Sequence, residues 1–589
     1  MRSNTGLASS RMVIASRLAY SNRHAAAMEK KAGGETYTPK LLADFVARQI
    51  IQTACLETRE GVLRVLDPAV GDGELLVSLL AQLKHLPRVK IEIYGFETNP
   101  QAKTIAAARL QCDFPTVPVH LEELSFLEYV LENFGNSDLF RSRTAEPFDL
   151  IIANPPYVRT QIMGAAQAQR LANQFGLIGR VDLYYAFLMG MAQVLRPRGV
   201  AGIIVSNRFM TTKSGSAVRS AIRERFNLRH VWDLGDTKLF EAAVLPAVLL
   251  VEGRNGHADE RPTFTSIYEA DQITEFRTLN PIDALEHDGV IEIPDGRRYR
   301  VRHGKLDVRG GSDAVWRIAT EAGDAWLATV EAHSWGTFRD IGKIRVGVKT
   351  CADKVFIRSD WDDLPAEDRP ELLRQLTTHH IARRFKARES NGIRRILYPH
   401  EVKNGNRQAV DLEQYPRARA YLERHRAALE NRKYVTDAGR KWFEIWVPQD
   451  PAAWEVPKLV FRDISDVPMF WIDKAGTIVN GDCYWLIAEK ANAEDLLWLA
   501  VAVGNSTFIE AFYDHRFHNK LYAGRRRFIT QYVERFPLPN PKSPIGLSII
   551  EMAKAAYDAV GTDEGERLTV ELNRLVWKAF GLPVEEIGG

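Results

Sequence analysis

The sequence predicts an α/β fold with a mostly parallel sheet in its first half and a domain of mixed α+β structure in its second half. Between Tyr37 and about Arg254, apolar strand-like runs alternate with segments that have the apolar spacing of helices. Such alternation is typical of parallel sheets covered by helices on both faces. After about Asn255 the segments become irregular, aromatic and basic. The chain has 589 residues, more than one ordinary hydrophobic core accommodates.

Apolar spacing and length place the individual elements. The expected helices of the first half are Leu41–Thr53, Gly73–Leu83 and Ala186–Leu195. The expected strands are Val62–Leu66, Ile91–Phe96, Asp149–Ile152, Val200–Val205 and Ala247–Val251. Two further helices are expected at the end of the chain, Ile545–Val560 and Glu564–Phe580. The order predicts an N-terminal extension at 1–35, a first domain at 36–255, a connecting region at 256–335, a second domain at 336–542 and a helical tail at 543–589.

Composition excludes several classes of protein. The net charge of +3 is nearly neutral, so a nucleic-acid surface requires local clustering of basic residues. The four cysteines form no CxxC pair, and we expect neither a structural zinc site nor a disulfide framework, and no bound metal. No apolar run approaches the roughly 18 residues of a membrane span. We interpret the Arg-rich, acid-free start as a frayed extension, with Met28 as an alternative initiator, rather than as a transit peptide.

A glycine-bearing turn follows the first expected strand. Its sequence from Val65 to Leu76 is VLDPAVGDGELL, in which the glycines allow a ligand to approach the backbone closely. Open α/β sheets bind ligands at the carboxyl ends of their strands, where this turn lies. The second strand is followed by Glu97, whose carboxylate can accept both hydroxyls of a ribose. The carboxylates of Asp67 and Asp72 suit a sulfonium-bearing amino-acid ligand better than a pyrophosphate.

The segment DLIIANPPY ends an apolar strand abruptly at Asn-Pro-Pro-Tyr. Pro155 and Pro156 lack backbone N–H groups, while their carbonyls can still accept hydrogen bonds. The side-chain oxygen of Asn154 and the carbonyl of Pro155 can both accept from one NH₂ group, which makes its nitrogen electron-rich enough to attack a methyl sulfonium. Tyr157 offers an aromatic face on which a planar base can stack, a contact worth ~1–3 kcal/mol. The absence of a Pro-Cys pair argues against methylation of cytosine C5.

These motifs, together with Thr38-Pro39 upstream, resemble those of the TaqI-type (gamma-class) amino-methyltransferases of restriction–modification systems, and they follow in the same order. The resemblance implies a Rossmann-like methyltransferase domain, S-adenosylmethionine as cofactor and the N6 amino group of a flipped adenine in duplex DNA as target. It implies cofactor contacts from Thr38, Asp67, Pro68, Ala69, Gly71, Glu97, Phe126 and Asn154. It assigns catalysis to Asn154, Pro155, Pro156 and Tyr157.

Two further positions are placed by the resemblance. Phe240 falls where the family has a second aromatic side chain that packs against the flipped base, beside Tyr157. Phe126 matches the aromatic residue that stacks on the adenine of the cofactor, but the family's preceding Asp is replaced by Ser125. Ser125 or nearby Glu123 would therefore have to supply the polar contact to that adenine.

The second half of the chain carries the basic residues that an enzyme acting on DNA requires. Between Ile381 and Lys441 there are 16 Lys/Arg against 7 Asp/Glu. Because a base must be flipped out of the duplex before N6 can react, extra surface is needed to hold and read the DNA. We expect a DNA target-recognition domain at 336–542, with phosphate or base contacts from Arg383, Arg384, Lys386, Arg388, Arg525, Arg526 and Arg527.

Other functions are compatible with part of the pattern. The same amino-group chemistry serves cytosine N4, although Ser usually replaces Asn154 there, and RNA adenine remains an alternative. Enzymes that methylate release-factor glutamine share NPPY but lack a second half of this kind. An inactive DNA-binding specificity subunit would not need an intact Asn154–Tyr157 motif. We found no PD…(D/E)xK nuclease pattern, and we expect a monomeric methyltransferase in the bacterial or archaeal cytoplasm, with double-stranded DNA and a separate cognate restriction endonuclease as partners and no membrane.

Overall fold

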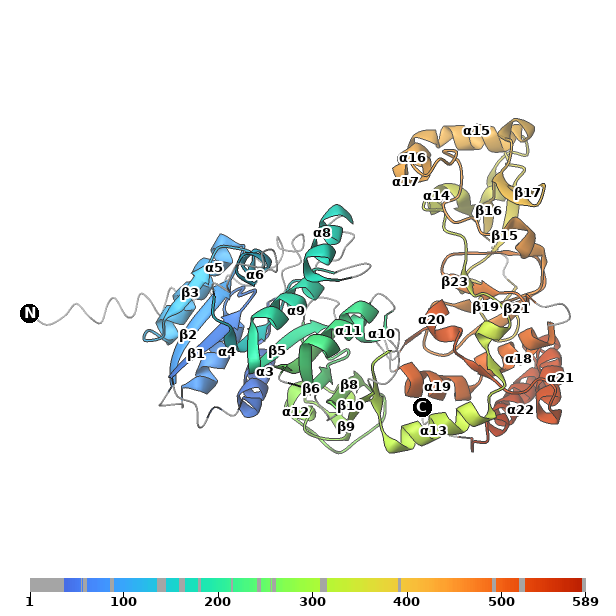
Figure 1. The fold of residues 1–589 in the computed structure, drawn as a ribbon. Coiled ribbons are helices and arrows are strands. Elements are labelled where there is room, and N and C mark those ends of the chain that lie inside the picture. The colour runs from blue at the N-terminus through green and yellow to red at the C-terminus, as the bar shows by residue number, and fades with distance from the viewer. Residues whose placement is uncertain are drawn as a thin grey trace, which may run out of the picture. The chain divides into compact units, whose positions relative to one another are not determined.

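The computed structural model describes residues 37–54, 56, 61–84, 89–134, 145–157, 165–177, 182–212, 215–240, 245–254, 256, 261–307, 315–389, 394–489, 494–517 and 525–584. These residues form two compact units that divide after Ala319, an N-terminal unit and a C-terminal unit (Figure 1). Met28 and the rest of the N-terminal extension lie outside the described residues.

An eleven-stranded sheet is the middle layer of the N-terminal unit. Its first seven strands lie in the order β3-β2-β1-β4-β5-β7-β6. All neighbours in this part are parallel except β7, which runs antiparallel to both β5 and β6. The strands are β1 (Gly61–Asp67), β2 (Val89–Phe96), β3 (Val119–Glu122), β4 (Phe148–Ala153), β5 (Leu195–Ser206), β6 (Phe226–Asp233) and β7 (Pro246–Gly253).

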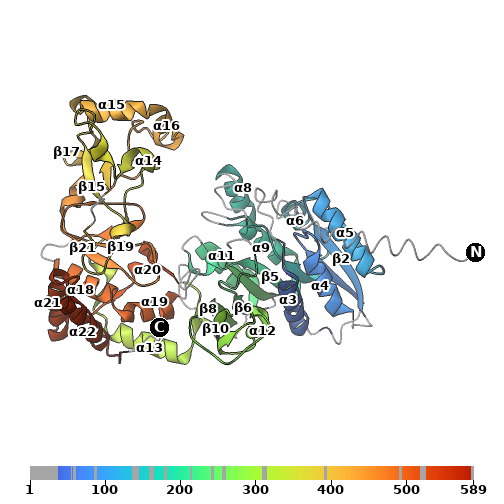
Figure 2. The same cartoon turned by 180° about the vertical axis from the view of Figure 1, so that it is seen from behind.

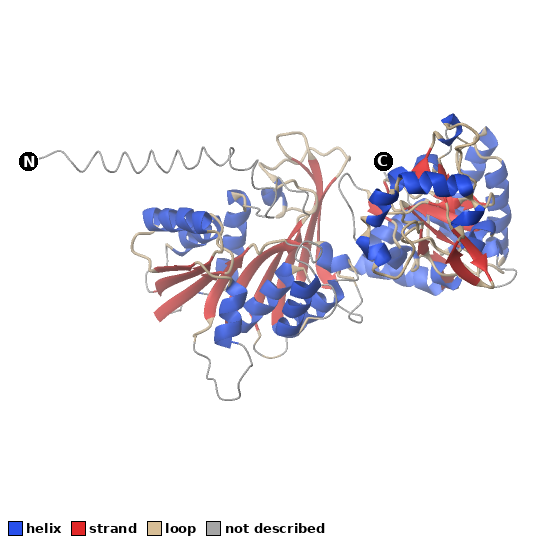
Figure 3. Ribbon diagram, turned by 90° about the horizontal axis from the view of Figure 1, so that it is seen from above, coloured by secondary structure: helices blue, strands red, loops and turns tan. Residues whose placement is uncertain are grey.

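Helices cover both faces of this sheet, which is seen edge-on between them in Figure 3. Because successive side chains of a strand point to opposite faces, each buried strand contributes apolar side chains to the cores on both sides of the sheet. Leu150 and Ile152 of β4 belong to one hydrophobic cluster, and Ile151 and Ala153 belong to the other. The first face carries α3 (Lys40–Thr53), α4 (Glu74–Leu83), α5 (Pro100–Asp113) and the short α12 (Pro281–Ala284). The second face carries α6 (Phe126–Phe134), α8 (Ala165–Phe175), α9 (Leu183–Val194), α10 (Arg208–Thr211) and α11 (Ser216–Arg225). The predicted α/β class with helices on both faces is therefore confirmed.

The sheet continues through the segment that the sequence analysis assigned to a connecting region. Four more strands extend it beyond β6: β8 (Thr263–Glu269), β9 (Gly289–Glu292), β10 (Arg298–Asp307) and β11 (Arg317–Ala319). β8 is parallel to β6, and β10 is antiparallel to β8, β9 and β11. The compact unit therefore extends to Ala319 rather than ending near residue 255. β8 pairs the edge of β6 that would otherwise be left open, and β10 continues the sheet beyond β8.

The C-terminal unit mixes helices with short strands of two to five residues, which confirms the predicted α+β character (Figure 2). One four-stranded sheet has the order β13-β23-β19-β21 and a second has the order β14-β16-β15-β22. Their strands are β13 (Arg345–Val346), β14 (Ile357–Arg358), β15 (Leu373–Thr377), β16 (Arg395–Leu397), β19 (Lys458–Arg462), β21 (Phe470–Asp473), β22 (Ile478–Val479) and β23 (Cys483–Leu486). Three two-stranded ribbons pair β12 (Gly336–Thr337) with β25 (Pro537–Leu538), β17 (His400–Lys403) with β18 (Asn406–Ala409), and β20 (Ile464–Ser465) with β24 (Arg526–Arg527).

The helices of the C-terminal unit include the two predicted at the end of the chain. They are α13 (Glu321–His333), α14 (Asp353–Phe356), α15 (Pro416–Arg424), α16 (Arg426–Glu430), α17 (Lys433–Thr436), α18 (Glu494–Gly504), α19 (Thr507–Phe517), α20 (Thr530–Val533), α21 (Pro544–Asp558) and α22 (Asp563–Ala579). The expected helical tail corresponds to α21 and α22, and both pack against α18 as part of the same compact unit.

No single helix among the described residues is long and apolar enough to cross a membrane. Within the described part of the chain, α18 and α19 are the one pair that together reach that length and composition, and they are bent by 78° at the break between them.

Candidate active site

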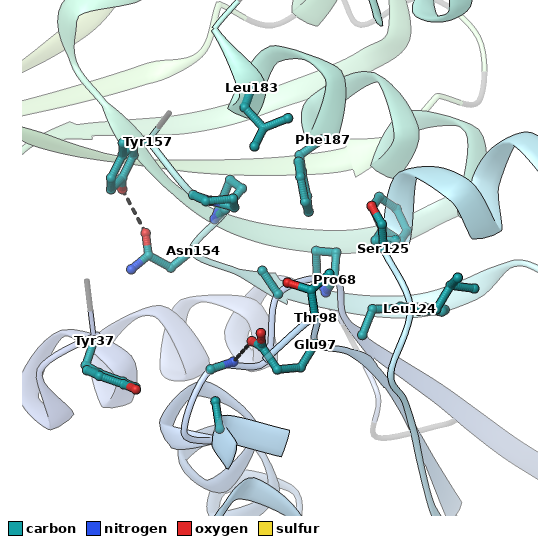
Figure 4. Close-up of a pocket in the computed structure, with 17 residues that line it drawn as sticks. Tyr37, Pro68, Glu97, Thr98, Leu124, Ser125, Asn154, Tyr157, Leu183 and Phe187 are labelled. Atoms are coloured by element: carbon teal, nitrogen blue, oxygen red, sulfur yellow. Dashed lines mark hydrogen bonds between the residues drawn. The ribbon is translucent and has the colours of Figure 1, made fainter. Parts of the chain in front are cut away.

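A pocket of about 280 Å³ opens where β1, β2 and β4 end, at the carboxyl edge of the parallel strands (Figure 4). The turn after β1, the residues after β2 and the residues after β4 form its walls. The predicted site residues that line it are Pro68, Ala69, Gly71, Glu97, Phe126, Asn154, Pro155, Pro156 and Tyr157. The other lining residues are Tyr37, Phe96, Thr98, Ala102, Leu124, Ser125, Leu183 and Phe187. Six stretches of the chain, from Tyr37 to Phe187, therefore converge on one cavity.

Backbone geometry of the glycine turn brings it close to Glu97. Gly71 has φ of +55° and its N–H donates to Glu97 Oε2 at 2.9 Å. Gly73 has φ of +83°, and a Cβ there would lie only 3.2 Å from that of Ala106 on α5. The other carboxylate oxygen of Glu97 accepts from the N–H of Asn99 at 2.7 Å. Two backbone donors thus fix the carboxylate at the pocket wall and leave each oxygen capacity for another hydrogen bond.

Asp67 closes β1 and is fully buried next to Pro68 and Ala69, and it does not itself line the pocket. Its Oδ1 accepts from the N–H of Ala69 at 3.0 Å, whereas its Oδ2 has no hydrogen-bond partner among the described residues. Removal from water raises the pKa of Asp67 to about 7, with smaller contributions from the charges of Glu97 and Asp72. A buried carboxylate oxygen without a partner fits the ammonium group of an amino-acid ligand, which is what the predicted cofactor would present.

The second carboxylate of the turn is already neutralised. Arg109 of α5 lies 3.6 Å from Asp72 and 2.8 Å from Glu74, and its guanidinium also donates to the backbone carbonyl of Asp72 at 2.9 Å. Of the two acids that made the turn acidic in sequence, Asp67 is the one left for a cationic ligand. Asp72 instead ties the turn to α5.

A hydrogen-bonded chain runs through Thr38, Asn154 and Tyr157. The Asn154 side-chain amide donates to Thr38 Oγ1 at 3.0 Å. The Tyr157 hydroxyl donates to Asn154 Oδ1 at 2.8 Å (Figure 4). Thr38 therefore lies against the asparagine and does not line the pocket, where the resemblance had placed it as a cofactor contact. Desolvation raises the pKa of the Tyr157 phenol far above its usual value, so this hydroxyl stays protonated and remains a donor. The ring of Tyr157 meets Tyr184 edge-on at 6.1 Å between centroids.

The departure from the family pattern at Ser125 has a structural counterpart. Phe126 packs between Phe96 and Phe187, with 5.7 Å between centroids in each case, and lines the pocket together with Ser125. Glu123 forms an ion pair with Lys103 at 3.6 Å and does not line the pocket. Of the two candidates for a polar contact beside Phe126, Ser125 is the one at the cavity.

Phe240 does not line the pocket. It is 6% exposed and belongs to the hydrophobic cluster on the α3 face of the sheet. The residues that follow it, 241–244, lie outside the described residues. A contact of Phe240 with a target base therefore stays a prediction.

The sequence analysis missed seven pocket residues, Tyr37, Phe96, Thr98, Ala102, Leu124, Leu183 and Phe187, and the last two lie on α9. Leu183 and Phe187 are four residues apart, so they face the cavity from adjacent turns of this helix. The residues around them are also apolar and buried. The apolar pattern of the sequence does not distinguish an apolar side chain that lines a pocket from one that packs in the hydrophobic core. Among the described residues, no three His, Cys, Asp or Glu side chains form a group that could hold a metal ion.

The basic residues predicted to contact DNA have different environments. Arg388 and Arg525 are exposed, and Arg383 and Lys386 are partly exposed. Arg384 is partly buried, donates to the carbonyl of Pro468 at 3.3 Å, and its side chain is 34% exposed.

Arg526 is buried and its guanidinium is fully engaged within the C-terminal unit. It is 7% exposed and pairs with Asp514 at 2.9 Å and with Glu510 at 3.2 Å. The expectation that Arg526 contacts DNA is therefore corrected: the side chain stabilises the fold. Arg527 pairs with Asp463 at 3.1 Å but remains 41% exposed.

Comparison with known proteins gives two family matches. Residues 92–240 match the Eco57I restriction-modification methylases, and residues 386–538 match the TaqI-like C-terminal specificity domain. The chain is 38% identical over 572 residues to the type II methyltransferase M.BanIII of Aneurinibacillus aneurinilyticus, covering 94% of this chain and 98% of that protein. It is 25% identical over 570 residues to M.PaeR7I of Pseudomonas aeruginosa, covering 94% and 93%.

A solved structure has a similar fold over most of the chain. The ATP-dependent Type ISP restriction-modification enzyme LlaBIII bound to DNA superposes with a TM-score of 0.52 at 11% identity, covering 92% of this chain and 41% of that one.

Asp67 gives a prediction about the pH dependence of cofactor binding. Because its pKa is about 7, roughly half of the free protein carries a proton on Asp67 at pH 7. An ammonium-bearing ligand favours the ionised form, so binding of S-adenosylmethionine should release a proton, and affinity should rise between pH 6 and about 7.5. Calorimetry in buffers of different ionisation enthalpy measures the release. Asp67→Ala should bind more weakly and without that release; pH-independent binding by the unaltered chain would contradict the assignment.

Arg526 gives a prediction that separates a structural role from a DNA contact. Arg526→Met leaves Glu510 and Asp514 without their buried partner and should lower the free energy of unfolding by about 3–5 kcal/mol. The matched control Arg527→Met removes a half-exposed pair and should cost about 1 kcal/mol or less. Denaturant titration measures both. Unchanged stability of Arg526→Met combined with weakened DNA binding would reverse the interpretation.

Proposed function

The chain belongs to the type II DNA methyltransferases of restriction–modification systems, and from that premise we propose that it methylates the N6 amino group of an adenine flipped out of duplex DNA. S-adenosylmethionine is its cofactor and supplies the methyl group as an electrophilic sulfonium. The proposal concerns the target atom, the flipping of the base and the roles of the individual residues.

The observation that carries the proposal is the fixed orientation of the Asn154 amide. Because Thr38 accepts from its nitrogen, its oxygen faces the Tyr157 side of the pocket. That oxygen has a second lone pair, and the Pro155 carbonyl is a second acceptor on the same short segment. An adenine amino group held by both acceptors has its nitrogen lone pair out of the base plane and available for attack on the methyl group.

The remaining predicted site residues, of which Asp67 and Phe240 do not line the pocket, have the following proposed roles. Asp67 and the turn residues Pro68, Ala69 and Gly71 would hold the amino-acid part of the cofactor, and Glu97 would accept from its ribose. Phe126 would stack on its adenine beside Ser125. Tyr157 would stack on the flipped base, with Phe240 as the second aromatic contact.

Adenine is favoured over the alternatives by separate features. Cytosine N4 would use the same two acceptors, but Asn rather than Ser at position 154 favours adenine within the resembling family. The match to a specificity domain at residues 386–538 favours DNA over RNA and over release-factor glutamine. The intact pocket argues against an inactive specificity subunit.

We further propose that the C-terminal unit holds the duplex, with phosphate contacts from Arg383, Lys386, Arg388 and Arg525. Methyltransferases of this kind act on DNA in the cytoplasm alongside a restriction endonuclease. We propose that the separate cognate endonuclease shares the recognition site and that the methyltransferase works as a monomer.

Nucleoside analysis tests the target atom directly. Mixed-sequence duplex DNA incubated with methyl-labelled S-adenosylmethionine should carry label in N6-methyl-2′-deoxyadenosine. The control Asn154→Ala should retain cofactor affinity and lose at least about 10²–10³-fold in turnover, because an acceptor for the reacting group is missing. Label in N4-methylcytosine would overturn the base assignment, and normal turnover of Asn154→Ala would overturn the mechanism.

Thr38 gives a second prediction for the same mechanism. Thr38→Val keeps the shape but removes the acceptor that orients the Asn154 amide, so kcat should fall about 10-fold or more while cofactor affinity changes little. Thr38→Ser should restore kcat because the hydroxyl returns. A loss of cofactor affinity at constant kcat would instead support the contact expected from the family resemblance.

A further inference from the structure

Two carboxylate-anchored basic side chains lie close together in the C-terminal unit. His379 Nδ1 is hydrogen-bonded to Asp482 Oδ2, and Arg527 is held by Asp463. Neither pair belongs to the pocket described above. Arg527 lies in the segment that matches the specificity domain, whereas His379 lies just before that segment begins.

Strand pairing brings the two pairs together from four separate stretches of the chain. β15 runs parallel to β22, and the N–H of Asn480, the residue after β22, donates to the carbonyl of Thr377, the last residue of β15, at 2.8 Å. The chain that follows β15, which carries His379, therefore lies beside the chain that follows β22, which carries Asp482. Asp482 is in turn tied to Asp463 by a backbone hydrogen bond of 3.2 Å.

The ribbon of β20 and β24 completes the arrangement, because Ile464 pairs with Arg527. The resulting order is His379, Asp482, Asp463 and Arg527. Neighbouring strands are about 4.8 Å apart, so the two basic groups lie within a few strand spacings of each other.

Arg527 is fixed at both its backbone and its side chain. The buried Tyr513 hydroxyl donates to its carbonyl at 3.0 Å and accepts from its N–H at 3.3 Å. Its Nε and Nη2 donate to the two oxygens of Asp463 at 3.1 and 3.4 Å. The side chain is nevertheless 41% exposed. The two hydrogen bonds to Asp463 use one side of the guanidinium fork, and the donors on Nη1 lie on its other side.

His379 is held in the same way. Its Nδ1 is hydrogen-bonded to Asp482, and its ring packs against the ring of His380 with 3.9 Å between centroids. The side chain of His379 is 40% exposed. Its other ring nitrogen, Nε2, is the atom available for an external hydrogen bond.

The charge of these pairs separates base reading from phosphate binding. Each basic group already has a carboxylate partner, so neither pair has an excess of positive charge to offer a phosphate. A carboxylate that already holds a guanidinium or an imidazole in one orientation instead reduces the conformational entropy that this side chain loses when it forms a hydrogen bond with a base. Arginine bound through two donors to O6 and N7 of guanine is the commonest specific contact in the major groove.

We propose that Arg527 and His379 read adjacent base pairs of the recognition site, with Arg527 bound to a guanine, and that Asp463 and Asp482 are positioning residues for them. The proposal rests on the proposed function in that the C-terminal unit must engage duplex DNA. It does not depend on which base is methylated.

Mapping the methylated motif on a random-sequence DNA library tests the proposal. Arg527→Lys keeps the charge and loses the fork, so discrimination at one G·C position should fall about 10- to 100-fold. His379→Phe keeps the ring and its packing on His380 but removes both nitrogens, and should relax a neighbouring position. Cofactor affinity and the salt dependence of DNA binding should stay as in the unaltered chain.

Asp463→Asn tests the positioning role without removing the reader. It should relax the same position as Arg527→Lys, to a smaller extent. It also provides a readout if Arg527→Lys fails to fold, which denaturant titration would show.

Two arginines serve as matched controls. Arg525→Ala removes an exposed arginine two residues from Arg527, and should weaken DNA binding uniformly and lower the salt slope by about 1 without changing the motif. Arg574→Ala, on the surface of α22 with a side chain 65% exposed, should change neither the motif nor the salt slope.

The failure of this proposal differs from failure of the proposed function. If Arg527→Lys, Asp463→Asn and His379→Phe all methylate DNA normally and at an unchanged motif, Arg527 and His379 do not read bases, and the proposed function still stands. A motif change in Arg525→Ala equal to that in Arg527→Lys would also overturn it. If the unaltered chain leaves DNA unmethylated, both proposals are wrong.

Discussion

The hydrogen bond from the Asn154 amide to Thr38 is the contact on which the catalytic arrangement depends. It joins the end of β4 to the residues just before α3, two places far apart in the sequence. The position of α3 is set by its close packing on β5, where Gly202 has no Cβ: an added Cβ would lie 2.6 Å from Val46. The packing of one helix on a glycine of the sheet therefore fixes where Thr38 lies and which way the Asn154 amide points.

The same sheet edge explains why cofactor and target can share one cavity. β1, β2 and β4 are parallel neighbours, so the residues after them meet at one edge. The turn after β1 and Glu97 after β2 are joined by a hydrogen bond, while the Asn-Pro-Pro-Tyr segment closes the other side. A reaction between two bound molecules requires this proximity, and the parallel topology provides it.

The sequence predicted the fold best where strands are continuously buried. β4 is buried at every position and could be placed from its apolar run, whereas β3 is half-exposed and α5 buries only small or widely spaced side chains, so neither was predicted. The strands after residue 255 were missed because their place in the sheet depends on pairing with the open edge of β6. The motif residues around the pocket were predicted, but the apolar face of α9 and the partner of Thr38 depend on three-dimensional packing that no local pattern records.

Arg525, Arg526 and Arg527 show the same limit for charged residues. They form one basic run in the sequence, yet alternation along β24 buries Arg526 among carboxylates and leaves its neighbours at least partly exposed. Charge clustering identified the segment, and strand geometry assigned different roles within it.

The central claim is that the Asn154 oxygen and the Pro155 carbonyl hold the amino group that is methylated. A crystal structure with duplex DNA and a non-transferring analogue of S-adenosylmethionine tests it most directly. The account predicts a flipped adenine stacked on Tyr157, with its N6 within hydrogen-bond distance of both acceptors and the Asn154 nitrogen still donating to Thr38. An adenine outside the pocket, or an Asn154 amide turned to present its nitrogen to the base, would contradict it.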